Sequence, residues 1–99
     1  MNELLNIIYY ICLNYPNRDD LSNARLNKII YLADWRNVLR RGHQVSQINW
    51  IFYHYGPFVF DIINEVSAHE DIFEVRYVPN DFGKPKQIIS LRNGLNQVN

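Results

Sequence analysis

The sequence lacks the features that mark several large classes of protein. Its single cysteine, Cys12, has no partner in the chain, so an internal disulfide is excluded. No apolar run approaches the ~18 residues that a membrane-spanning helix needs. The apolar N-terminal stretch has no basic leader and no small-residue cleavage site, so we interpret it as folded, cytoplasmic chain and not as a signal peptide.

The chain also lacks net charge, since ten basic residues balance ten acidic ones. Binding to nucleic acid through bulk electrostatics needs a net basic surface, so neither nucleic acid nor a membrane is an expected partner. Aromatic residues are abundant instead, with seven tyrosines, five phenylalanines and two tryptophans in 99 residues. This composition predicts a single domain over residues 1–99 and favours a protein-binding module, because aromatic side chains with polar tips suit interfaces.

The residues that usually carry catalysis or bind metals do not cluster in the sequence. His43, His54 and His69 lie far apart, and no pair of potential ligands has the close spacing of a zinc site. Cys12 falls on an apolar helical stripe, where a thiol is a buried filler with a raised pKa. Glycine-rich phosphate loops and nucleophile elbows are also missing. We therefore expect no enzyme, no metal and no cofactor.

Apolar periodicity predicts two helices in the first half of the chain. The first covers residues 2–15, and the second begins at a cap on Asp20 or Ser22 and runs to Arg41, with Gly42 past its end. Between residues 29 and 39 the apolar side chains of the second helix point in nearly every direction. We therefore expect this helix to be buried on most sides, with the fold built around it.

In the second half of the chain the apolar residues recur with a shorter period, the alternation that is typical of strands. Alternating residues predict a strand over 47–55, and Pro57 then suits the first turn of a helix that ends near His69. Two further alternating runs, 73–77 and 86–91, predict a β-hairpin with a loop over 79–85, whereas residues 92–99 are assigned no structure. The predicted fold is α+β, with a helical core around a long central helix and a small antiparallel sheet made of one strand plus the hairpin.

Asp34 interrupts the apolar run of the second helix and must be paired if it is buried. Arg41 and Lys28 are candidate partners, although their helical angles place neither directly beside it. A donor from the predicted strand or from the third helix fits equally well. The simplest interpretation of Asp34 is a structural one, in which it forms a satisfied buried pair or lies on a helix side facing solvent.

A basic stripe on the second helix supports an alternative function. Four cations project within about 120° of one another around the helix axis. A basic stripe of this kind, beside a hairpin wing that carries Lys84 and Lys86, is typical of a DNA-binding regulator of an operon. Apolar residues share that arc, so part of the face is expected to be covered, and snorkelling side chains explain the stripe as well. The four cations are Arg25, Lys28, Arg36 and Arg40.

The segment from Trp50 to Phe60 is rich in aromatic residues and includes a Gly56-Pro57 step. Glycine permits a turn there and proline fixes the next φ, so the joint between strand and helix is expected to be stiff. Phe58 and Phe60 point away from the apolar face of the predicted third helix. If these two rings are exposed, they form a patch that needs a partner; otherwise they belong to a local core.

The block Leu26-Asn27-Lys28-Ile29-Ile30-Tyr31-Leu32-Ala33-Asp34, followed by Gly42 and by Tyr55-Gly56-Pro57, resembles the Panacea domain of antitoxins. This family includes SocA-like and GepA-like proteins of bacterial phages, prophages and mobile elements. The resemblance covers about residues 21–91. Family members often carry further helices after the hairpin, whereas this chain stops at Asn99. The matching positions are Lys28, Tyr31, Asp34, Gly42, Tyr55, Gly56 and Pro57.

The resemblance implies a non-enzymatic protein that binds and neutralises a toxin encoded beside it, and family members are associated with many unrelated toxins. A SocA-like protein can also act as an adaptor that delivers its toxin to a protease. We predict that the contact surface combines the aromatic joint with the neighbouring surface of the second helix, because Trp, Tyr and Arg dominate interface energetics. The predicted contact residues are Trp35, Arg36, Tyr55, Phe58 and Phe60.

Overall fold

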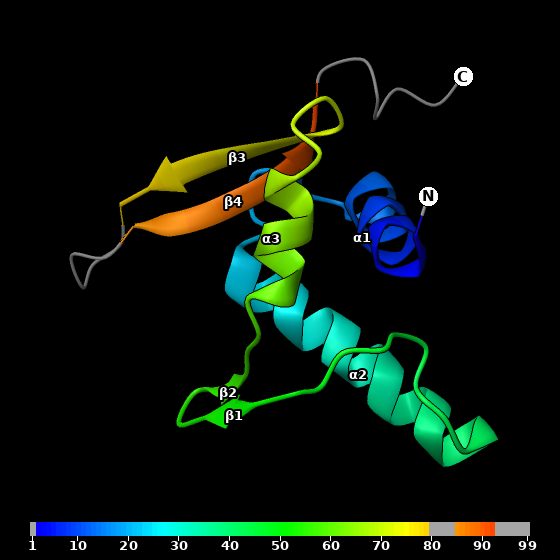
Figure 1. Ribbon diagram of the computed structural model, residues 1–99. Helices are drawn as coiled ribbons and strands as arrows, with labels where there is room; N and C mark the ends of the chain where they lie inside the picture. The colour runs from blue at the N-terminus through cyan, green and yellow to red at the C-terminus, as the bar shows by residue number, and fades with distance from the viewer. Residues whose placement is uncertain (1, 80–84, 93–99) are drawn as a thin grey trace.

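The computed structural model describes residues 2–79 and 85–92, and shows there an α+β fold with three helices and two small antiparallel sheets (Figure 1). The predicted α+β class is confirmed, whereas the single sheet of one strand plus the hairpin is not, because the strands form two separate sheets. The helices are α1 (Glu3–Asn14), α2 (Asn23–Arg41) and α3 (Asp61–Ser67). One sheet pairs β1 (Phe52–Tyr53) with β2 (Gly56–Pro57), and the other pairs β3 (Phe73–Val78) with β4 (Lys86–Leu91).

The first two helices begin and end where their capping residues indicate. The Asn2 side chain accepts a hydrogen bond from the Leu5 N–H at 2.7 Å, and Ser22 Oγ accepts one from the Arg25 N–H at 3.1 Å. Gly42 closes α2 in the left-handed conformation, with φ of 82°. The sequence prediction of both helices is confirmed to within a residue or two, and Ser22, not Asp20, is the cap of α2.

The β3–β4 hairpin also follows the prediction. Its register pairs Phe73 with Leu91 at the open end and Val78 with Lys86 beside the turn. The start of α2 lies against β4, because the Ile89 N–H donates to the Leu21 carbonyl at 2.9 Å. The hairpin is thereby tied to the first turn of α2. Residues 80–84, and with them Lys84, lie outside the described residues, as do residues 93–99.

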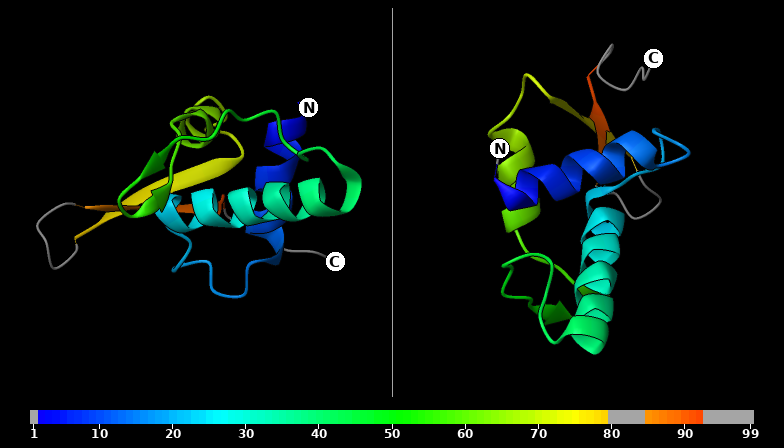
Figure 2. Two further views of the ribbon diagram at one scale, coloured as in Figure 1. Left: turned by 90° about the horizontal axis from the view of Figure 1, so that it is seen from below. Right: turned by 90° about the vertical axis from the view of Figure 1, so that its right-hand side faces the viewer.

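The hydrophobic core lies beside the N-terminal half of α2. Figure 2 shows α1, α3 and the β3–β4 hairpin gathered around that half, while the C-terminal half extends beyond them. Buried side chains from all of these elements meet there, among them Leu5, Ile8, Leu26, Ile30, Ile62, Val66, Phe73 and Ile89.

A helix at the centre of the fold is not confirmed. Although α2 has 19 residues, its C-terminal half is covered mainly on one side, by the chain that follows Gly42 (Figure 2). Leu32, Trp35 and Leu39 are 56%, 53% and 66% exposed, so the expectation that the apolar residues of 29–39 are covered on most sides is wrong. A helix of this length spans about 28 Å, and the core elements packed on α2 gather along its first half only.

The predicted strand over 47–55 and the predicted helix start at Pro57 are also wrong. Only Phe52 and Tyr53 of the first segment form a strand, and they pair with Gly56 and Pro57 instead of joining the β3–β4 hairpin. Helix α3 begins at Asp61. Its expected apolar face is confirmed by buried Ile62 and Val66.

Cys12 is buried in the core, as predicted, and burial raises the pKa of its thiol to about 12. None of the helices in the described ranges has the length and apolar character needed to cross a membrane.

Candidate functional site

Asp34 holds the chain that follows α2 against the side of that helix. Its carboxylate is 2% exposed and accepts hydrogen bonds from the backbone N–H groups of Val45, at 3.0 Å, and Ser46, at 2.8 Å. The Ser46 hydroxyl, the Gln44 amide at 3.1 Å and the Trp50 indole N–H at 2.9 Å donate to the other oxygen. Five donors therefore converge on one buried carboxylate, which makes Asp34 the fixed point of this loop.

These partners resolve the alternatives that the sequence left open. Trp50, which lies in the segment predicted as a strand, does donate to Asp34. Among the described residues, neither Lys28 nor Arg41 hydrogen-bonds to it, and α3 supplies no donor. The other donors come from residues 44–46, a segment that periodicity could not single out because it is neither helix nor strand.

Two further residues of the motif support the same segment. The Tyr31 ring lies edge-on between Trp50, at 5.4 Å between centroids, and Phe52, at 5.2 Å. Gly56 has φ of +121°, which L side chains rarely adopt, and a Cβ there would meet Lys28 Cε at 3.6 Å. Lys28 therefore lies next to the turn that Gly56 makes possible.

Asn27, which was not among the predicted site residues, is fully buried. Its Oδ1 accepts a hydrogen bond from the Val59 N–H at 2.9 Å, and its Nδ2 donates to the Asn23 carbonyl at 2.9 Å. Asn37 Nδ2 donates to the His43 carbonyl at 2.8 Å. The signal that could have identified Asn27 is its place inside the block quoted for the family resemblance.

Residues 43–59, here called the clamped segment, thus lie along one side of α2 and are held at both ends. Asp34 and Asn37 fix its beginning, Tyr31 its middle and Asn27 its end. Gly42 supplies the reversal that brings the chain back along the helix. Most motif residues therefore have a structural role, which agrees with the structural interpretation of Asp34.

Three aromatic side chains of the clamped segment and Phe60, the residue that follows it, form a cluster at the β1–β2 turn. Tyr53 and Tyr55 stack at 5.8 Å, Phe58 contacts Tyr53 edge-on, and Phe60 contacts Phe58 edge-on at 5.5 Å. Tyr55 is 69% and Phe60 is 64% exposed, whereas Phe58 is half-buried. We call these four residues the aromatic cluster. Its exposure leaves the rings available to a partner.

The other two predicted contact residues, Trp35 and Arg36, lie further along α2, where they line a shallow hollow with Leu32, Leu39 and Arg40. Tyr55 and Phe58 line a different hollow, at the start of α2. A third hollow connects the two, because it shares Ser22 and Ala24 with one and Leu32 with the other. The five predicted residues therefore share no pocket and lie toward opposite ends of one surface that follows α2.

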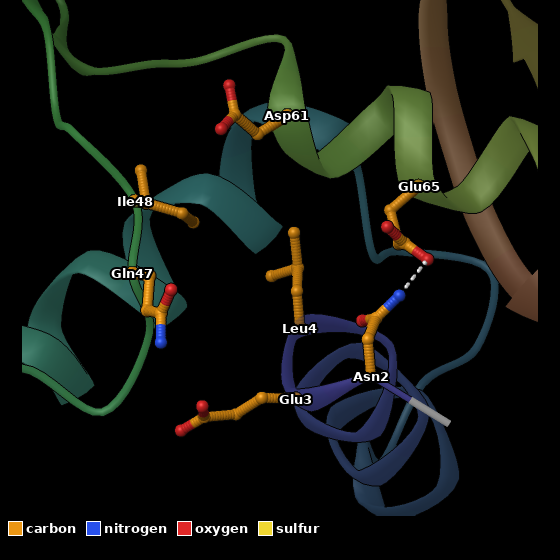
Figure 3. Close-up of a pocket in the computed structure, with 7 residues that line it drawn as sticks. All are labelled: Asn2, Glu3, Leu4, Gln47, Ile48, Asp61 and Glu65. Carbon is orange, nitrogen blue, oxygen red and sulfur yellow. Dashed lines mark hydrogen bonds between the residues drawn. The ribbon is translucent and has the colours of Figure 1, made fainter.

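A separate hollow of about 460 Å³ lies between the start of α1, the start of α3 and the clamped segment (Figure 3). Three carboxylates line it. Glu65 accepts a hydrogen bond from Asn2 at 2.9 Å, while the carboxylates of Glu3 and Asp61 point to different sides (Figure 3). They do not converge on one point as paired catalytic acids do.

No group of three or more His, Cys, Asp and Glu side chains within residues 2–79 and 85–92 could hold a metal ion. His43 and His54 are exposed, and His69 Nε2 lies within hydrogen-bond distance of the Glu65 carboxylate, at 3.0 Å. Four cations of the predicted basic stripe, Arg25, Lys28, Arg36 and Arg40, are exposed on α2.

These observations define a small α+β domain whose most prominent surface is aromatic, apolar and basic. The family model of the antitoxin SocA-like Panacea domain matches residues 26–94, which is more than half of the chain, and the chain belongs to this family. The match runs from α2 through the hairpin and so includes the whole clamped segment. Neither the curated proteins nor the solved structures include a significant match.

Proposed function

We propose that this protein neutralises a toxin by binding it directly, in the cytoplasm and without catalysing a reaction. Membership of the SocA-like antitoxin family supports an antitoxin-like role. The observation that carries the binding mode is the exposure of large aromatic and apolar side chains on the β1–β2 turn and along α2, outside the hydrophobic core.

Large rings at an interface are strong anchors. Tyr55, Phe60 and Trp35 each expose more than half of their surface, and truncating such a ring where it is a hot spot of an interface costs ~2 kcal/mol or more of binding. The aromatic cluster is also well positioned, since two features fix the backbone within it: Gly56 forms the turn between Tyr55 and Phe58, and Asn27 holds the N–H of Val59. Little conformational entropy is then lost when a partner binds.

Co-expression with the product of the neighbouring reading frame tests this proposal. The wild-type chain should restore growth and co-purify with that product. The double variant Phe58→Ala and Phe60→Ala should do neither, because it removes half of the aromatic cluster. Tyr77→Ala is the matched control, since Tyr77 is a ring on β3 of similar exposure to Phe60.

Phe58 is half-buried, so the single variant Phe60→Ala separates binding from folding. We expect it to unfold in urea like the wild type and to neutralise less well. Full neutralisation by both aromatic variants would rule out the aromatic cluster as the contact, and failure of the wild type would rule out the proposed function. The lifetime of the toxin in the same cells distinguishes two ways of neutralising it. Delivery to a protease shortens that lifetime, whereas neutralisation by binding alone does not.

A further inference from the structure

One side of α2 combines cations with large apolar residues, and except at half-buried Ile29 it is exposed along the helix. At about 100° per residue, the exposed side chains of this stripe span an arc of about 140° around the helix axis. The Asp34 carboxylate lies on the other side of the helix, where the clamped segment uses it fully. We call this exposed stripe the outer face of α2; it consists of Arg25, Lys28, Leu32, Trp35, Arg36, Leu39 and Arg40.

The charge of the outer face is unbalanced. Between residues 21 and 60 the sequence contains five Lys and Arg side chains but only one carboxylate, Asp34. Among the described residues, no carboxylate forms a salt bridge with Arg25, Lys28, Arg36 or Arg40. Although the chain as a whole is neutral, this surface carries positive charge that a partner is left to complement.

The apolar residues of the outer face have the spacing of a helix-packing ridge. Leu32, Trp35 and Leu39 stand at positions i, i+3 and i+7, so they form one row along the helix. The row continues through Ile29 into an apolar groove of about 490 Å³ between α2 and α1. That groove is lined by Ile7, Tyr10, Ile11, Ile29, Ala33 and Val45, together with Glu3 and Asn6.

We propose that the outer face of α2 binds an amphipathic helix of the toxin whose apolar stripe is flanked by Asp and Glu. This inference rests on the proposed function and names the chemistry of the partner. The apolar ridge would pack against the stripe, and the cations beside it would pair with the carboxylates. With 19 residues, or about 28 Å, α2 offers room for about five turns of a partner helix.

Two other occupants fit the outer face less well. Nucleic acid would complement the cations but would leave the apolar ridge and the adjoining groove without a partner. A second copy of this chain would need an exposed helix that is both acidic and apolar. Helix α1 carries one acidic residue, Glu3, and the seven-residue α3 buries Ile62 and Val66 in its own core.

The test uses the full chain and three synthetic helical peptides of about 18 residues, or about 27 Å. The first has leucine on one face flanked by glutamate, the second replaces every glutamate with lysine, and the third is a scrambled version of the first. Fluorescence anisotropy should show that the glutamate peptide binds at least about tenfold more tightly than the other two. Its affinity should fall as salt rises from about 50 to 300 mM.

Charge-reversal variants place the interaction on the outer face. Arg36→Glu combined with Arg40→Glu should weaken binding of the glutamate peptide by at least about tenfold. Arg41→Glu is the matched control, because Arg41 is an exposed cation in the same last turn of α2 but outside the arc. It should change the affinity by less than about twofold, since surface substitutions away from a contact have small effects.

Four results would overturn the inference. The first is a lack of preference for the glutamate peptide, and the second is an equal effect of the double variant and of Arg41→Glu on its affinity. The third is a DNA duplex that binds the wild type more tightly than the glutamate peptide does and that the double variant no longer binds. The fourth is a dimer of the wild type in sedimentation that the double variant abolishes.

Toxin neutralisation separates this inference from the proposed function. If the variant with Arg36→Glu and Arg40→Glu neutralises the toxin as well as the wild type does, the inference fails and the proposed function stands. If the wild type does not neutralise the toxin, the proposed function fails whatever the peptides do.

Discussion

Replacing Asp34 with alanine should destabilise the whole domain, because five donors lose their acceptor at once. Val45 and Gln44 are exposed enough for water to replace the carboxylate, whereas Ser46 is buried. A hydrogen bond to a charged group contributes about 1.5–3 kcal/mol, so losing both bonds from Ser46 should cost about 3–6 kcal/mol. That is a large part of the roughly 5–15 kcal/mol by which a domain is stable.

Urea denaturation followed by circular dichroism measures this cost directly, and in thermal denaturation the melting temperature should fall by about 15–30 °C. Hydrogen exchange should show faster exchange of the Ser46 amide before the core amides are affected. Asp34→Asn should also destabilise the domain, because its NH₂ group would face the donors of Trp50 and Gln44.

The control for this experiment is Asp19→Ala, since Asp19 is an exposed carboxylate that pairs with Arg76 at 2.8 Å. Surface ion pairs contribute little, so its cost should stay below about 1 kcal/mol. A loss of less than about 1 kcal/mol for Asp34→Ala would refute the view that this carboxylate fixes the loop, because unmet buried donors alone cost more than that.

Three other predictions concern the same framework. Asn27→Ala leaves the Val59 N–H without its acceptor and should cost about 1–3 kcal/mol in urea denaturation, with loss of exchange protection at Val59. Gly56→Ala should cost about 1–2 kcal/mol by the same measurement because of the positive φ of this residue. The space beside Gly56 accepts a methyl group, so no steric clash adds to that cost, and unchanged stability would contradict the prediction. Cys12 should react with a thiol reagent far more slowly in the folded protein at pH 8 than in urea, because its pKa of about 12 leaves the buried thiol protonated, and equal rates would contradict its burial.

The elements that the sequence predicted well are those with strong local signals. Helix α1 has a clear apolar stripe, α2 has Ser22 and Gly42 at its ends, and the β3–β4 hairpin has two alternating runs separated by a turn-rich loop. In each case the signal lies within the element itself or in the residues that border it. Such local preferences survive packing because the tertiary contacts agree with them.

The segment around Trp50 misled the prediction for a physical reason. Ile48 is buried and Trp50 half-buried, while Asn49 and Ile51 are exposed, so the alternation of an extended chain is real. Its cause, however, is contact with the side of α2 and not pairing with another strand. Periodicity reports which side chains face inward, but not which element covers them.

The relative positions of the predicted contact residues could not be derived from the sequence, because periodicity does not report how segments far apart in the chain pack together. The exposure of Phe60 agrees with its expected direction, whereas the distance between Trp35 and the aromatic cluster follows from the path of the clamped segment along α2. The three acidic residues around the hollow in Figure 3 come from α1 and α3 and were not identified at all.

The two sides of α2 are under different constraints on their sequence. Substitutions at Asn27, Tyr31 or Asp34 disturb the architecture, whereas positions 32, 35, 36, 39 and 40 point to solvent and tolerate replacement at little thermodynamic cost. If the exposed side binds the toxin, as we propose, a lineage can change its preference for one toxin or another there while inheriting the same scaffold. New specificities would then evolve by changing a handful of codons in a single helix.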